Sequence, residues 1–290
     1  MSNVDAVRMR ALSPFRRIAL GTWHTPMDPQ IYGTLKLRME PALAYIADAR
    51  RRTGQRVTVT HLVIKAIGAA LAACGDANVV LRGSRPYRRR GVDVSVLVAV
   101  DGAGGQPDLS ATKIEAVDGK TPVDIAAELE RRARDVRAHR QDQHDDGMRR
   151  ARRMLGFVPT WLMGLVLRFV TFLSYTLNLD LRRFGVPRDP FGAAVVSSIG
   201  SLGLESALIP LVAYSRAPIV IAAGAVTDEP VVEGGKVVPG KVMRLGATFD
   251  HRVIDGSHAA VMADTIRRAI EQPWTLDDIV PECEGQQAGS

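Results

Sequence analysis

Cysteine and clustered metal-binding residues are scarce in this chain. Its 290 residues include two cysteines, Cys74 and Cys283, and no Cys-x-x-Cys pair or cluster of histidines. This pattern argues against a disulfide framework and against a structural zinc site. We therefore expect no bound metal.

Aromatic residues are also few, at 5% of the chain, which leaves little surface on which nucleic-acid bases could stack. The net charge of +7 comes largely from arginine clusters at 50–52, 88–90 and 149–153. No zinc-finger spacing or RNP-like motif accompanies these clusters, so we expect no nucleic-acid partner. The positive charge suits smaller anionic partners, such as phosphorylated cofactors, or an acidic lipid surface.

The first residues, MSNVDAVRMRALSPFRR, contain no apolar core behind their charges. They do not read as a signal peptide, so we expect a cytoplasmic protein. Hydrophobic residues make up 46% of the chain and charged residues 24%, the usual mix of a globular protein. We expect a single domain over residues 1–290.

Hydrophobic periodicity predicts helices mostly early in the chain and strands mostly late. The predicted segments are a strand and a helix over 34–53, a strongly apolar helix over 58–74, a strand over 92–100, a helix that begins near residue 121, strand-like segments at 193–199, 218–226, 229–238 and 241–249, and an amphipathic helix over 257–272. Gly234-Gly235 reads as a hairpin turn, and Pro273 ends the last helix. This order favours an α+β fold with a mixed sheet.

Residues 154–179 contain a single charged residue, Arg168, and lie in an apolar helical insert that we predict over 148–190. Three interpretations stay open: a helical hairpin buried between subunits, a helix lying on a membrane surface, and a transmembrane span. The length would cross ~30 Å of hydrocarbon. Against a span, the arginine would cost ~2.5–3.5 kcal/mol at the bilayer centre.

The string ATFDHRVIDGSHAA places His251 at the end of a predicted strand, just before an Asp-Gly turn into a helix. Histidine is the side chain best suited to take up a proton at neutral pH. By spacing alone, a structural histidine beside a turn would be the better interpretation. His258 and His61 are interpreted as structural.

DHRVIDG resembles the active-site motif of the dihydrolipoamide acyltransferases, the core subunits of 2-oxoacid dehydrogenase complexes, and more distantly that of chloramphenicol acetyltransferase. The resemblance extends to LSPFRRIAL, THLVIKAIGAALAACGDANVVL and VVSSIGSLG, and it covers residues 12 to about 140 and 191–275. It implies an α+β, chloramphenicol-acetyltransferase-like fold in which helices pack on a mixed sheet in two layers, with the apolar helical insert added.

The resemblance also assigns roles to individual residues. His251 would be the general base that takes the proton of an attacking thiol, and Ser197 would stabilise the oxyanion. Ser198 is the alternative for that serine and a candidate substrate-binding residue. Asp255 would hold the histidine loop through a salt bridge, for which Arg17 in LSPFRR is the candidate partner.

The implied function is acyl transfer between coenzyme A, as a substrate, and a dihydrolipoamide-like thiol. The family's active site lies between subunits, so a homotrimer or a larger assembly of trimers is implied. We expect no covalent lipoyl group on this chain, so another chain would supply the acyl carrier. The alternative is a non-catalytic oligomeric scaffold of the same fold, docked to a membrane through the insert.

Overall fold

The computed structural model describes residues 3–8, 29–101, 107–141 and 160–276. The strands are β1 (Ala6–Arg8), β2 (Gln30–Arg38), β3 (Val79–Arg82), β4 (Arg85–Arg89), β5 (Val94–Asp101), β6 (Pro107–Ile114), β7 (Ala194–Ser198), β8 (Ile219–Glu233) and β9 (Lys236–Asp250). The α-helices are α2 (Glu40–Thr53), α3 (Val59–Ala73), α4 (Pro122–Gln141), α6 (Thr160–Thr171) and α7 (Gly256–Glu271).

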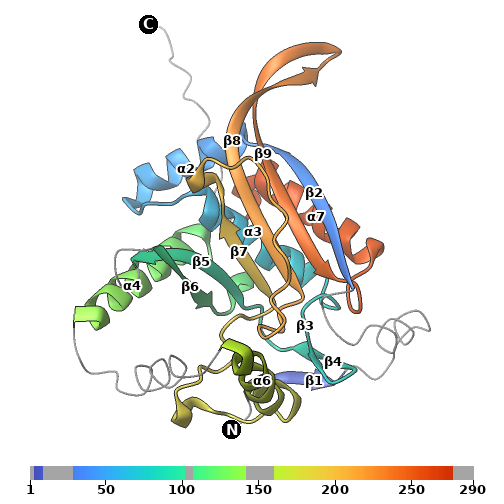
Figure 1. Ribbon diagram of the computed structural model, residues 1–290. Coiled ribbons are helices and arrows are strands. Elements are labelled where there is room, and N and C mark those ends of the chain that lie inside the picture. The colour runs from blue at the N-terminus through green and yellow to red at the C-terminus, as the bar shows by residue number, and fades with distance from the viewer. Residues whose placement is uncertain (1–2, 9–28, 102–106, 142–159, 277–290) are drawn as a thin grey trace, which may run out of the picture.

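Six strands form the main sheet in the order β2-β9-β8-β7-β5-β6. The central strand β7 runs parallel to both of its neighbours, β5 and β8, and the remaining pairs are antiparallel. Helices α2, α3 and α7 cover one face of this sheet (Figure 1). The prediction of an α+β fold with a mixed sheet is therefore confirmed.

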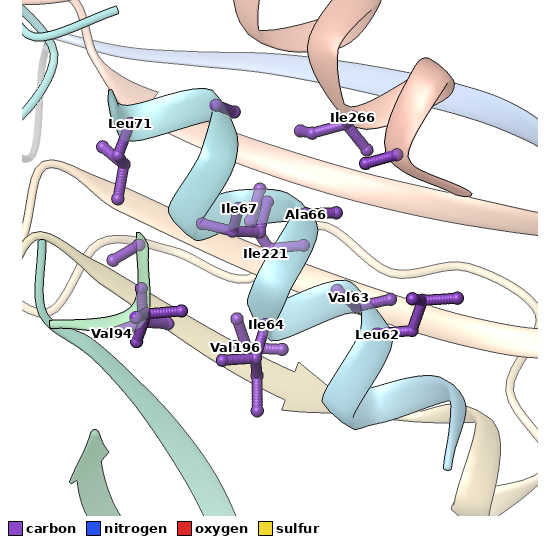
Figure 2. Close-up of a cluster of buried hydrophobic side chains, with 14 of the residues drawn as sticks. Leu62, Val63, Ile64, Ala66, Ile67, Leu71, Val94, Val196, Ile221 and Ile266 are labelled. Atoms are coloured by element: carbon purple, nitrogen blue, oxygen red, sulfur yellow. The ribbon is translucent and has the colours of Figure 1, made fainter. Parts of the chain in front are cut away.

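Helix α3 forms the centre of the core because almost every side of it is apolar. Figure 2 shows its side chains between the sheet and α7. The buried residues labelled there are Leu62, Val63, Ile64, Ala66, Ile67 and Leu71 of α3, Val94, Val196 and Ile221 of the sheet, and Ile266 of α7. The predicted burial of this helix on most sides is confirmed.

Strands β8 and β9 differ from the prediction, because they replace three predicted segments with two long strands. The hairpin turn lies at Gly234 and Gly235 as predicted, with φ of 55° and 77°. The predicted breaks at 227–228 and 239–240 are both continuous strand, and Pro230, inside the predicted segment 229–238, pairs with Pro239. Proline is tolerated there because this outer part of the hairpin extends beyond the other strands of the sheet (Figure 1).

A smaller antiparallel sheet, in the order β1-β4-β3, lies beside the main one. Helix α6, which belongs to the predicted insert, lies next to it and continues into one π-helical turn, Phe172–Thr176 (Figure 1). Tyr175 of this turn packs in a buried cluster with Val4 and Val80. None of the described helices combines the length and apolar character that crossing a membrane requires.

A buried ion pair fixes the end of the insert to the small sheet. Arg89 of β4 donates to the carboxylate of Asp189, which also accepts a 3.3 Å hydrogen bond from the Tyr175 hydroxyl. The backbone N–H of Asp189 donates to Asn3 Oδ1 at 3.0 Å. We call Arg89, Asp189, Tyr175 and Asn3 the insert anchor. It joins the described residues at the end of the predicted insert to the buried part of the small sheet.

Candidate active site

The histidine of the DHRVIDG motif stands immediately after β9, which ends at Asp250. The backbone N–H of His251 donates to Pro29 O at 2.7 Å, and its ring Nδ1 lies 2.8 Å from Ile254 O. A carbonyl oxygen can only accept, so the proton of the neutral ring must be on Nδ1. Nε2 is then the basic nitrogen of this partly exposed side chain.

Asp250 and Arg252, on either side of His251, form a buried ion pair. Arg252 Nε donates to Asp250 Oδ1 at 2.9 Å, and Arg252 Nη2 donates to Asp250 Oδ2 at 2.6 Å. Both side chains are buried, as are Val253 and Ile254 after them. This arrangement clamps the turn from both sides and leaves the imidazole little freedom to change its direction.

Asp255 acts as the N-cap of α7. Its carboxylate accepts from the backbone N–H groups of Ser257 (3.0 Å) and His258 (3.2 Å), and also from their side chains. Partial burial acts to raise the pKa of Asp255, but the hydrogen bonds from Ser257 and His258 lower it well below its usual range. Asp255 is therefore an ionised group that shapes the turn. Arg17, its expected partner, lies outside the described residues.

The two candidate serines stand at the end of the central strand. Ser197 lies opposite Leu97 of β5 and Ala222 of β8, and Ser198 lies opposite Ala223. Side chains alternate along a strand, so the two serines point to opposite faces of the sheet. Val195 belongs to the apolar cluster away from α3, so Ser197 shares that face.

Residues 199–209 cross this same face of the main sheet, over β8 and β9 (Figure 1). The crossing is close: a Cβ atom on Gly224 would lie 1.9 Å from Glu205 O, and one on Gly246 would lie 2.0 Å from Ala207 O. Glycine is therefore required at both positions. The segment after Ser198 is held tightly against the two longest strands.

The structure does not bring His251 and Ser197 together within one chain. Ser197 is level with Ala222, which is level with Gly246 of β9. His251 lies five residues beyond Gly246, or about 16 Å along the strand direction. Across the sheet, His251 and Ser197 are two strand spacings apart, because β8 lies between β7 and β9. Any contact between these two side chains requires a second copy of the chain.

A cavity behind the histidine turn contains a residue that the sequence did not point to. It is lined by Asp250 and Arg252 together with Arg216 and apolar residues such as Leu81 and Leu211. Burial, and then the charge of Arg252, lower the pKa of Arg216 below its usual range. Only the folded chain brings Arg216 to this place, so no local pattern could have revealed it.

His61 has a structural role, as we interpreted it. Its Nδ1 accepts the backbone N–H of Thr58 at 3.1 Å, which caps the start of α3. Burial, and then the charge of Arg50, lower the pKa of His61 to about 4. The ring is therefore neutral at physiological pH. Among the described residues, no three acidic, histidine or cysteine side chains gather into a potential metal site.

Comparison with known protein families assigns the chain to a family. The family model of the 2-oxoacid dehydrogenases acyltransferase catalytic domain matches residues 22–147 and 191–277. The chain belongs to this family. The match leaves out residues 148–190, the range that we predicted as an insert. The DHRVIDG motif and both serines lie inside the matched ranges.

The relatives of this acyltransferase-family chain agree with the assignment. The lipoamide acyltransferase component of the branched-chain alpha-keto acid dehydrogenase complex of Pseudomonas aeruginosa is 35% identical over 81 residues. That match spans 27% of this chain and only 19% of the relative. Curated relatives of the family are thus named as lipoamide or dihydrolipoyllysine acyltransferases of 2-oxoacid dehydrogenase complexes.

Solved structures show that the fold is that of the family's catalytic cores. A probable dihydrolipoamide acetyltransferase of Listeria monocytogenes aligns with a TM-score of 0.57 and 14% identity, covering 91% of this chain and 94% of its own. The cubic core of the pyruvate dehydrogenase multienzyme complex aligns with a TM-score of 0.57 and 16% identity, covering 92% and 93%.

Proposed function

We propose that this chain transfers an acyl group between coenzyme A and a thiol acceptor of the dihydrolipoamide type, with His251 as the general base. The observation that carries the proposal is the hydrogen bond between His251 Nδ1 and Ile254 O, which leaves Nε2 as the basic nitrogen. A thiol has a pKa of about 8.5, so a positioned base speeds its attack at neutral pH.

The proposed acyl transfer is direct, without a covalent acyl-enzyme intermediate. Nε2 takes the S–H proton while the thiol sulfur forms a bond to the carbonyl carbon of the acyl thioester. The Ser197 hydroxyl donates to the resulting oxyanion. When the carbonyl re-forms, the bond to the leaving sulfur breaks, and the imidazolium returns its proton to that sulfur. Asp255 and the Asp250–Arg252 pair hold the ring and move no protons.

This step requires a partner subunit, because His251 and Ser197 are far apart in one chain. We propose a homotrimer, or a larger assembly of trimers, in which His251 of one protomer faces Ser197 of the next. Exposed apolar side chains on and after the crossing segment support a subunit contact there: Leu202, Leu204, Leu208, Val212 and Tyr214. A cubic core is the assembly of one structural relative.

The acyl carrier in this proposal is a lipoyl group attached to a different chain, and coenzyme A is a substrate and not a resident cofactor. We place Ser198, on the opposite face of the strand from Ser197, near the bound substrate and not at the oxyanion.

Co-assembly of two inactive variants tests both the chemistry and the shared site. His251→Ala alone should lower acyl transfer from acetyl coenzyme A to dihydrolipoamide by about 10²–10⁴-fold. Ser197→Ala alone should lower it by about 10²–10³-fold. When the two variants are co-expressed, about a quarter of the sites pair a wild-type histidine with a wild-type serine across the subunit boundary. About a quarter of the wild-type activity should therefore return.

The matched control is each variant co-expressed with a tagged copy of itself, which should regain nothing. Failure of the mixed assembly to recover activity would place both groups in one subunit and refute the shared site. If wild-type protein acylates no thiol with any acyl coenzyme A donor, the alternative of a non-catalytic scaffold replaces the proposal.

A further inference from the structure

Helix α6 and the turn after it expose a stripe of large apolar side chains. Leu165, Phe169 and Phe172 are 57%, 62% and 47% exposed. Their spacing of four and three residues places them in one line along the helix surface. We call these three residues the α6 stripe. Large exposed apolar groups that cluster in this way mark an interaction surface on a folded protein.

The stripe cannot turn inward, because the opposite side of the same segment is fixed in the core. Thr171, Ser174 and Tyr175 are buried between or just after the stripe residues. Tyr175 and Asp189 are held by the insert anchor to the small sheet. The stripe is therefore displayed as a preformed surface, at the end of the molecule opposite the long β8–β9 hairpin (Figure 1).

The exposed charged side chains between residues 160 and 188 are arginines. Arg168 is exposed and lies three residues after Leu165 and four before Phe172, so it neighbours both on the helix surface. Arg183 is exposed too, with its guanidinium 5.7 Å from the centre of the Phe184 ring. Between residues 160 and 188 the sequence has one acidic residue, Asp180, and this carboxylate is paired with Arg182 at 2.7 Å.

We propose that the α6 stripe docks this protein onto the surface of an anionic membrane. The apolar side chains would enter the boundary between headgroups and acyl chains, and the arginines would meet lipid phosphates. Helix α6 has 12 residues and is about 18 Å long, which suits a helix lying in the plane of the interface. This inference is independent of the proposed acyl transfer.

Charge argues against a two-fold contact of this patch with a second copy of the chain. In such a contact the same patch meets itself, so Arg168 would face the Arg168 of the other copy. No unpaired carboxylate among the described residues of the insert could offset that repulsion. An anionic lipid surface supplies the missing negative charge.

Vesicle co-sedimentation of the full chain tests this proposal. We expect binding to vesicles of phosphatidylcholine mixed with phosphatidylglycerol, weakened by added salt, and little binding to phosphatidylcholine alone. The double substitution Leu165→Ser and Phe169→Ser should weaken partitioning by at least about tenfold. Replacing Arg168 and Arg183 by Gln should abolish the preference for phosphatidylglycerol.

The matched control is Val232→Ser with Val237→Ser, since these hairpin residues are both 72% exposed and lie far from α6. This control should bind as the wild type does, and all variants should keep the wild-type circular dichroism spectrum. Three results would overturn the proposal: no binding to anionic vesicles, equal binding by the serine variant of α6, or a serine variant whose main effect is a smaller particle. The last result would make the stripe a contact between copies of the chain.

Discussion

Replacing Asp189 with alanine should lower the free energy of unfolding by about 3–5 kcal/mol, the usual loss when one partner of a buried ion pair is removed. The side chains of Arg89 and Asp189 are only 3% and 6% exposed, so the variant leaves a guanidinium in the interior without its counter-ion. Tyr175 also loses the acceptor of its hydroxyl. The loss is a large part of the ~5–15 kcal/mol that stabilises a typical domain.

Urea unfolding followed by circular dichroism measures this effect, at one fixed protein concentration because assembly contributes to stability. The matched control is Asp264→Ala. Asp264 and its partner Arg268 are 61% and 65% exposed, so the unfolding midpoint should stay close to that of the wild type. The double variant Arg89→Met with Asp189→Leu should recover most of the loss, since it leaves no unpaired buried charge.

Two results would refute this reasoning. If Asp189→Ala and Asp264→Ala shift the midpoint equally little, the buried pair does not stabilise the fold. The single variants Arg89→Met and Asp189→Leu complete the comparison. If the double variant loses as much free energy of unfolding as these two together, the two side chains are not energetically coupled. A variant of Asp189 that cannot be produced folded can be replaced by Asp189→Asn, which keeps an acceptor oxygen for Tyr175.

Two further predictions concern a serine and a histidine. Ser197→Ala should lower turnover by about 10²–10³-fold with little change in coenzyme A affinity, whereas Ser201→Ala, at an exposed serine of the following turn, should leave turnover unchanged in steady-state kinetics. His61 must lose its proton to be buried, so the wild type should be fully stable above pH 6.5 and lose up to about 3 kcal/mol as the pH falls towards 4. His61→Gln should flatten this dependence in urea unfolding measured across the same pH range.

The parts of the fold that sequence predicts well are those with a strong local pattern. Helices α3 and α7 were predicted within two residues because the first is apolar on nearly all sides and the second has one apolar face. The Gly234-Gly235 turn was found because both residues require positive φ. The outer hairpin was divided wrongly because Asp228 and Pro239-Gly240 are poor strand formers and locally resemble breaks.

The site was only partly visible, because its geometry depends on contacts between distant segments. The N-cap role of Asp255 had a local signal, an aspartate directly before an amphipathic helix, and its bonds to Ser257 and His258 follow from it. The separation of His251 from Ser197 had no such signal. It depends on how β7, β8 and β9 align, and strand register cannot be read from single segments.

The pairing of β2 with β9 has a consequence for how the chain folds during synthesis. Gln30, in the first strand of the main sheet, lies opposite Asp250, in the last, and the backbone of His251 donates to Pro29. β7 likewise meets β5 only after the whole insert has been made. Such distant contacts close large loops and form slowly. Residues 30–250 must therefore all leave the ribosome before the main sheet can close, and the histidine turn reaches its final position only after β9 has paired with β2.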